Sequence, residues 1–149
     1  MATYETFKTF MENYFRDYSQ YAQDEETMPK MDKYWAEDIQ ITAYFKIPGG
    51  EYPMRMHNRR VWQDFLIKGH LTIWENLQPL DMALDVVQLK AASMLKVVKY
   101  DRKTDQELVN LDGIGYYTLA EESQGLLHIK SLDFYTGDAG TFAKLYTME

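Results

Sequence analysis

The sequence predicts an α+β fold, with helices in the first part of the chain and a long antiparallel sheet in the second. In the first part, apolar residues recur at steps of three and four, as they do on one face of a helix. From Asp81 to Gly137, four long segments with apolar and β-branched residues are separated by the polar turns DRKTDQE and EESQG. Helices that precede such a sheet gather on one of its faces.

No repeat, low-complexity tract or Pro/Gly/Ser linker divides the chain, so residues 1–149 are expected to form a single domain. The 149 residues, 46% of them hydrophobic, are enough for a sizeable core.

Two helices are expected at the start. An amphipathic pattern covers Tyr4–Tyr21, with aromatic residues and Met11 on one face. A shorter helix is expected from Thr27 as N-cap, with Pro29 in its first turn, to about Trp35.

A half-buried strand is expected next, over residues 39–45, because apolar and polar residues alternate until IPGG ends the pattern. Residues 51–56 are either a short strand or a loop. A further helix is predicted after Asn58 as N-cap, and Gly69 is either its end or a weak point before a continuation to about Glu75.

Four strands of an antiparallel meander are predicted over residues 81–90, 92–102, 107–120 and 126–137. The tail over residues 141–149 is either a last helical turn or a frayed end.

The composition excludes several classes of partner and site. A net charge of −7 repels nucleic acid and anionic membrane surfaces, so neither is an expected partner. The absence of cysteine excludes disulfides and thiolate metal sites, and no metal-ligand spacing, phosphate loop or dinucleotide fingerprint is present. We therefore expect neither a metal nor a cofactor. No apolar run approaches the roughly 18 residues of a membrane span, and the start, MATYETFKTF, lacks the pattern of a signal peptide, so a cytoplasmic location is expected.

Four segments, in order, carry a resemblance to a known superfamily: FMENYFRDYSQYA, MDKYWAEDIQITAYF, NRRVWQDFL and ESQGLLHIKSLDFY. Together they resemble the nuclear transport factor 2-like superfamily, which has a cystatin-like fold and includes the SnoaL-like polyketide cyclases, ketosteroid isomerase and scytalone dehydratase. The resemblance implies a conical α+β barrel with an apolar pocket inside the cone, and usually a homodimer formed through the sheet.

The acidic pair Glu37-Asp38 is interpreted through this resemblance as the joint between helix and strand. Where ketosteroid isomerase carries its two catalytic carboxylates, the resemblance places Ala43 and a position near Gly115. Because neither side chain can transfer a proton, steroid-type isomerisation by that mechanism is disfavoured.

In the third long strand, alternation divides the residues between two faces. The resemblance turns the odd-numbered set inward, where Gly113 and Gly115 would let the sheet bend. The even-numbered set is the expected dimer contact: Asn110, Asp112, Ile114 and Tyr116.

In the last strand, the resemblance favours the even-numbered face as the inner one, which brings His128 and Lys130 among apolar neighbours. His128 is then the candidate general acid or base, and Lys130 the candidate cation for an enolate or carboxylate. With the opposite orientation, Asp133 and Tyr135 line the pocket instead, and a histidine on a strand is more often structural. Both sets face inward only if the strand contains a bulge.

The pocket is expected to take a small apolar or aromatic molecule, because aromatic side chains combine apolar area with a polar group. An alternative is that these aromatic residues are plain core. The candidate ligand-binding residues are Tyr14, Tyr18, Trp35, Ala43, Trp62, Tyr117 and Lys130.

The basic segment MRMHNRR lies at the start of a helix, where the helix dipole disfavours cations. Either salt bridges to Glu51, Asp64 or a partner chain neutralise it, or it meets an anionic group of a ligand.

Two classes of function follow. The first is a cofactor-free lyase, cyclase or isomerase that uses His128. The second is a non-catalytic ligand-binding or dimerisation module.

Overall fold

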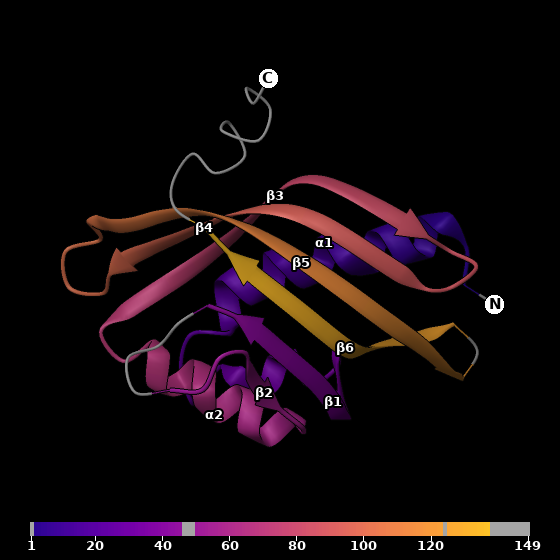
Figure 1. Ribbon diagram of the computed structural model, residues 1–149, viewed down its shortest axis with the longest axis horizontal. Helices are drawn as coiled ribbons and strands as arrows, with labels where there is room; N and C mark the ends of the chain where they lie inside the picture. The colour runs from indigo at the N-terminus through magenta and orange to yellow at the C-terminus, as the bar shows by residue number, and fades with distance from the viewer. Residues whose placement is uncertain (1, 46–49, 124, 138–149) are drawn as a thin grey trace.

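The computed structural model describes residues 2–45, 50–123 and 125–137. Figure 1 shows a curved sheet of long strands, with α1 (Tyr4–Tyr21) behind it and α2 (Arg59–Gly69) beside its short edge strand. The predicted tail over residues 141–149 lies outside the described residues.

The first helix is confirmed over the predicted range. It begins at Thr3, whose hydroxyl accepts a hydrogen bond from the Thr6 backbone N–H, while the Thr6 hydroxyl accepts one from the Thr3 N–H in return. This reciprocal cap satisfies backbone donors that a helix start leaves unpaired. The expected second helix is reduced to a single 3₁₀ turn, η1 (Met28–Met31), and the chain is already extended at Trp35.

The α2 helix begins at Asn58, as predicted, because the Asn58 side chain accepts from the Val61 backbone N–H at 2.8 Å. Its expected continuation to Glu75 is wrong. The helix ends at Gly69, and from Ile73 the backbone pairs with a neighbouring strand instead.

Within the described residues, six strands form one mixed sheet in the order β2-β1-β6-β5-β4-β3. Their bounds are β1 (Trp35–Tyr44), β2 (Met54–Met56), β3 (Ile73–Asp85), β4 (Lys90–Asp101), β5 (Glu107–Ser123) and β6 (Leu126–Thr136). The predicted meander is confirmed for β3 to β6, whereas β1 joins β6 in parallel. The strand predicted over residues 81–90 starts eight residues earlier, at Ile73, and includes a bulge between Pro79 and Asp81.

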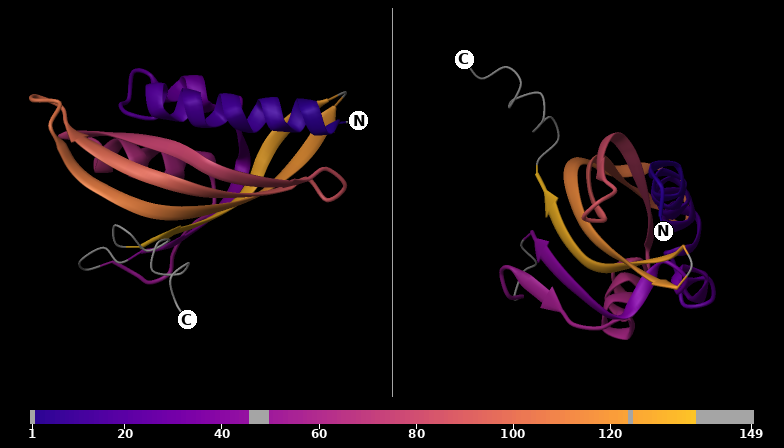
Figure 2. Two further views of the ribbon diagram at one scale, coloured as in Figure 1. Left: turned by 90° about the horizontal axis from the view of Figure 1, so that it is seen from above. Right: turned by 90° about the vertical axis from the view of Figure 1, so that its right-hand side faces the viewer.

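The sheet is curved into an open cone, and α1 lies on its concave side (Figure 2). The inner face of β5 is the predicted one, since Gly113, Gly115, Tyr117 and Leu119 are buried. A Cβ atom at Gly115 would lie 2.5 Å from the Tyr117 hydroxyl, so glycine is needed there for the ring to pack against its own strand.

A bulge in β6 changes which residues face the core. Leu119 of β5 pairs with Ile129, but the preceding Thr118 pairs with Ser131, so Lys130 is an extra residue. As a result, Ile129 is buried before the bulge and Leu132 after it. One strand therefore turns odd-numbered residues inward in its first half and even-numbered residues in its second.

Candidate functional site

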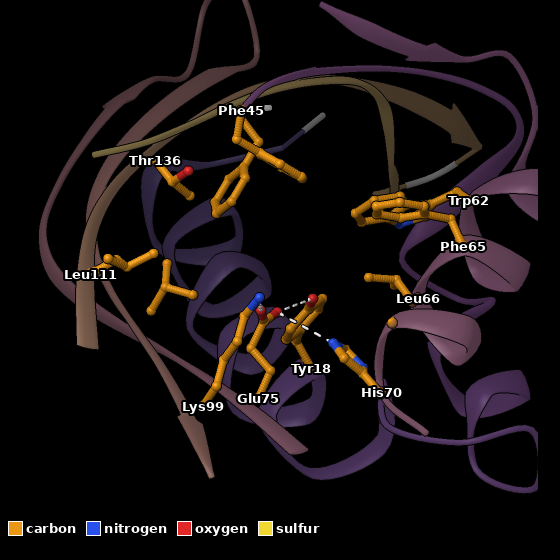
Figure 3. A pocket seen from close by; sticks show the side chains of 13 residues that line it. Tyr18, Phe45, Trp62, Phe65, Leu66, His70, Glu75, Lys99, Leu111 and Thr136 are labelled. Carbon is orange, nitrogen blue, oxygen red and sulfur yellow. Dashed lines mark hydrogen bonds and ion pairs between the residues drawn. The ribbon is translucent and has the colours of Figure 1, made fainter. Parts of the chain in front are cut away.

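A cavity of about 390 Å³ lies at the end of the cone nearest α2 (Figure 3). This size falls within the range of small-molecule sites. Its walls are mostly apolar, and its lining residues are Tyr18, Phe45, Trp62, Phe65, Leu66, Gly69, His70, Glu75, Val97, Lys99, Leu111, Phe134 and Thr136.

Four polar side chains meet on one side of this cavity, and we call them the polar floor: Tyr18, His70, Glu75 and Lys99. The Tyr18 hydroxyl donates to Glu75 Oε1 at 2.6 Å. His70 Nε2 lies 3.8 Å from the same oxygen, and Lys99 Nζ lies 3.8 Å from Glu75 Oε2. In Figure 3 the tips of these four side chains converge at the base of the apolar walls.

Different elements supply the members of the polar floor. Tyr18 lies in the last turn of α1, and His70 directly follows α2. Glu75 and Lys99 face each other across the β3–β4 ladder, where they are paired residues. The Gln23 side chain fixes the backbone of Glu75, since its amide donates to the Glu75 carbonyl at 2.7 Å and accepts from the Glu75 N–H at 2.8 Å.

The hydrogen bonds of His70 determine where its proton lies. Nδ1 is 2.9 Å from the backbone carbonyl of Ala22, which can only accept, so Nδ1 carries the hydrogen. In the neutral ring, Nε2 therefore has the free lone pair, and it is the nitrogen beside Glu75. Burial lowers the pKa of His70, against the opposing charge of Glu75. His70 is thus a neutral base at neutral pH.

Tyr18 is held in its protonated form. Burial raises its pKa well above the usual value, and the nearby Glu75 carboxylate acts in the same direction. Tyr18 is therefore a hydrogen-bond donor rather than a base.

The sequence matches no family profile and no protein with curated functional data. Solved structures, in contrast, match it over most of its length. A candidate SnoaL-like polyketide cyclase from Shewanella putrefaciens superposes with a TM-score of 0.66 at 9% identity, covering 96% of this chain and 97% of the other. AusH from Aspergillus nidulans gives a TM-score of 0.71 at 7% identity, with 93% and 88% covered. A candidate isomerase from Bacillus subtilis gives 0.65 at 11% identity, with 92% and 90% covered.

The chain therefore has the α+β cone fold of these SnoaL-like structures.

Within this SnoaL-like fold, two of the predicted ligand-binding residues, Tyr18 and Trp62, line the cavity. Tyr14, Tyr117 and Ala43 are buried but do not line it. The Tyr14 hydroxyl instead accepts a hydrogen bond from Trp35 in the core.

Trp35 backs the cavity wall. It packs edge-on against Trp62 at 5.8 Å between ring centroids, and Trp62 stacks on Phe65 at 6.0 Å. The rings of Trp62 and Phe65 form an aromatic side of the cavity, and Trp35 packs behind them.

His128 and Lys130 lie in a separate outer cleft with Trp35, because the bulge in β6 turns them away from the cone interior. Their expected placement inside the cone is wrong. His128 Nδ1 is 3.0 Å from Glu122 Oε2, and Lys130 Nζ is 2.6 Å from Asp38 Oδ1. The hydrogen bond from Lys130 lowers the pKa of Asp38. A catalytic role for His128 stays a prediction for this cleft, and it does not extend to the cavity.

Two arginines of the basic segment at the start of α2, Arg59 and Arg60, form ion pairs within the chain. The Arg59 guanidinium donates to the Trp35 carbonyl at 3.1 Å and lies 3.6 Å from Asp32 and 3.8 Å from Glu37. Arg60 pairs with Asp64 at 3.4 Å, one of the partners that the sequence suggested. Glu37 and Asp38 are therefore paired with surface cations outside the cavity.

The sequence patterns did not indicate His70, Glu75 or Lys99 as functional residues. If α2 continued to Glu75, as the sequence suggested, His70 and Glu75 would lie on different faces of that helix. A usable signal was present, because Glu75 stands between Ile73 and Leu77 in an alternating segment, at a position expected to be apolar. Among residues 2–45, 50–123 and 125–137, no group of three His, Cys, Asp or Glu is arranged to hold a metal ion.

Proposed function

We propose that this protein binds a small apolar or aromatic molecule in the cavity and catalyses a cofactor-free proton transfer of isomerase, cyclase or lyase type. The observation that carries the proposal is the neutral, buried His70, whose free Nε2 lies beside Glu75 at the floor of an apolar cavity. The cyclases and isomerases among the structural neighbours support the reaction type.

In the proposed reaction, His70 Nε2 removes a proton from a carbon next to a carbonyl group of the ligand. The Glu75 carboxylate stabilises the imidazolium that forms, and Lys99 donates a hydrogen bond to the enolate oxygen. Return of the same proton to a different carbon completes an isomerisation. Attack of the enolate carbon on an electrophilic carbon of the same molecule, with the proton returned to the oxygen produced, completes a cyclisation.

The charge of the polar floor favours a neutral ligand. Glu75 carries one negative charge, Lys99 one positive charge, and His70 and Tyr18 are neutral. Stacked rings and aliphatic side chains form the rest of the wall. An aromatic or terpenoid ketone fits this combination of an apolar body and a hydrogen-bond acceptor.

The test begins with a thermal-shift screen of α-tetralone, carvone and β-ionone, since a ligand that binds the folded state raises its melting temperature. The compound that gives the largest shift is then incubated in D₂O, and loss of its α-proton signal is followed by NMR. We expect the protein to accelerate this exchange over buffer by at least about tenfold. If none of the compounds binds, the proposed ligand class is refuted.

Two variants separate the two roles of His70. In His70→Asn, the side-chain amide N–H stands where Nδ1 stood and keeps the bond to Ala22, but the base is lost. In His70→Gln, the amide nitrogen reaches the position of Nε2 as a donor. We expect both variants to lose the exchange, with His70→Asn the better folded of the two. Unchanged exchange in His70→Asn contradicts His70 as the base.

The alternative is a non-catalytic binding module. It is favoured by Ala43 and Gly115, which stand where the resemblance places the catalytic carboxylates of ketosteroid isomerase. Binding without any acceleration of exchange is the result that this alternative predicts.

The outer face of the sheet supports the expected homodimer. Ile114 and Tyr116 expose 37% and 38% of their surface, and the neighbouring Tyr135 stacks on Tyr44. Asp112, also expected at this contact, is instead buried beside Lys96.

Within the described part of the chain, no helix has the length and apolar character needed to span a membrane. With no cysteine in the sequence, we propose the cytoplasm as its compartment.

A further inference from the structure

We propose that Arg102 is a positioning residue, which holds His70 in the Nδ1–H tautomer and so keeps the Nε2 lone pair directed at Glu75. This inference rests on the proposed function, since it explains how the base of that reaction is held. Arg102 itself lies in the turn after β4 and does not line the cavity.

The guanidinium of Arg102 connects two backbone segments. Its Nε donates to the carbonyl of His70 at 2.7 Å, and its terminal nitrogen donates to the carbonyl of Gln23. Its own backbone N–H donates to the carbonyl of Thr72 at 3.0 Å. Arg102 thus joins the segment after α2 to the segment after α1.

The same two segments carry the contacts that define the base. Ala22, next to Gln23, supplies the carbonyl that accepts from His70 Nδ1. Gln23 also pairs through its side chain with the backbone of Glu75. Ala22 and Gln23 therefore hold both members of the His70–Glu75 pair.

The connection made by Arg102 matters because the two neutral tautomers of the His70 ring are close in energy. Neutral imidazole carries its proton on either nitrogen, and the partner of Nδ1 decides which. Without Arg102, the Ala22 carbonyl and the His70 ring are free to separate, and Nε2–H facing the Glu75 carboxylate becomes the favoured form. The base would then have its lone pair directed away from Glu75.

The experiment is ¹⁵N NMR of the full chain labelled at histidine, which is simple because the sequence has three histidines. Imidazole nitrogen shifts distinguish the two tautomers, and His70→Asn assigns the His70 signals. We expect the Nδ1–H tautomer in the unmodified protein at pH 7.5 and a predominant Nε2–H tautomer in Arg102→Met. Lys103→Met, which removes an exposed cation from the adjacent position, serves as the control. Its His70 spectrum should be unchanged.

Arg102→Lys provides a second variant if Arg102→Met does not fold, since lysine keeps the charge and donates to one carbonyl. We expect a mixture of tautomers in this variant. Nδ1–H shifts that stay unchanged in whichever of the two variants folds overturn the proposal.

The two proposals fail separately. In the exchange assay, Arg102→Met should bind the ketone with the same thermal shift but lose about tenfold or more in rate. If the unmodified protein shows no exchange, the proposed function fails while the tautomer measurement still tests Arg102. Exchange that depends on His70 but not on Arg102, with an unchanged tautomer, leaves the function intact and removes the positioning role.

Discussion

At the scale of single residues, the polar floor combines groups that are costly to bury alone. Glu75 is buried, yet the Tyr18 hydroxyl donates to its carboxylate and the Lys99 ammonium lies 3.8 Å from it. A buried carboxylate is tolerated because such partners replace the water it loses. The side chains of the polar floor that carry the proposed function therefore also affect stability.

Tyr18→Phe tests the contribution of the Tyr18 hydroxyl to stability. Removal of the hydroxyl leaves Glu75 Oε1 without its 2.6 Å donor, and hydrogen bonds to charged groups contribute roughly 1.5–3 kcal/mol. We expect the free energy of unfolding in urea to fall by about 2 kcal/mol. Tyr4→Phe is the matched control, because Tyr4 is 52% exposed and its hydroxyl has no part in the core. Equal stability of the two variants contradicts a role for Tyr18 in stabilising Glu75.

The lowered pKa of His70 predicts a pH dependence of stability. Its usual pKa is about 6.5, so between that value and the lower folded-state value the unfolded chain binds the proton first. The free energy of unfolding then falls as the pH drops below about 6.5, by at most about 1.4 kcal/mol per pH unit. Urea unfolding from pH 7.5 to 5.0 should show this loss, and His70→Asn should reduce it. The same slope in His70→Asn would mean that His70 is not its source.

At the scale of elements, the sequence predicts α1, the start of α2 and the two alternating faces of β5 because local patterns determine them, whereas the resemblance indicates which face of β5 is the inner one. Thr3, Asn58 and the alternation around Tyr117 act within a few residues. The end of α2 and the bulge at Lys130 depend on pairing with distant strands, and a single period along β6 cannot show a change of face. The unpredicted end of α2 is why the sequence did not indicate His70, and the unpredicted bulge in β6 is why it placed His128 on the wrong face.

Gly115→Ala tests the packing of β5. The new Cβ would lie 2.5 Å from the Tyr117 hydroxyl, and the Tyr117 ring is itself packed against Tyr14 and Phe15. Because a core without free space resists added volume, we expect a loss of about 1–3 kcal/mol in the free energy of unfolding. Gly69→Ala is the control, since nothing lies within 4 Å of a Cβ added there. An unchanged free energy of unfolding in Gly115→Ala would show that the Tyr117 ring has room to move.

At the scale of the whole molecule, the open sheet has two different faces. The α1 helix lies on the concave side of the sheet (Figure 2), and its residue Tyr18 lines the cavity. On the outer face, Ile114 and Tyr116 are exposed at the middle of β5. A homodimer through this face would leave the cavity of each protomer intact.

Sedimentation equilibrium over a range of concentrations tests this arrangement. We expect a dimer for the unmodified chain and a monomer for the double variant Ile114→Lys/Tyr116→Lys. Burial of two lysine charges without ion-pair partners at an apolar contact is unfavourable. Leu71→Lys is the control, since Leu71 is 71% exposed and does not belong to β5. A monomer at all concentrations in the unmodified chain refutes the homodimer.

The role of His70 as the base is tested most directly by α-proton exchange of the best-binding ketone in D₂O, compared between the unmodified protein and His70→Asn. We expect exchange in the unmodified protein at least about tenfold faster than in buffer. In His70→Asn the exchange should be abolished while the thermal shift caused by the ketone is kept. Equal exchange rates in the two proteins would contradict the assignment of His70 as the base.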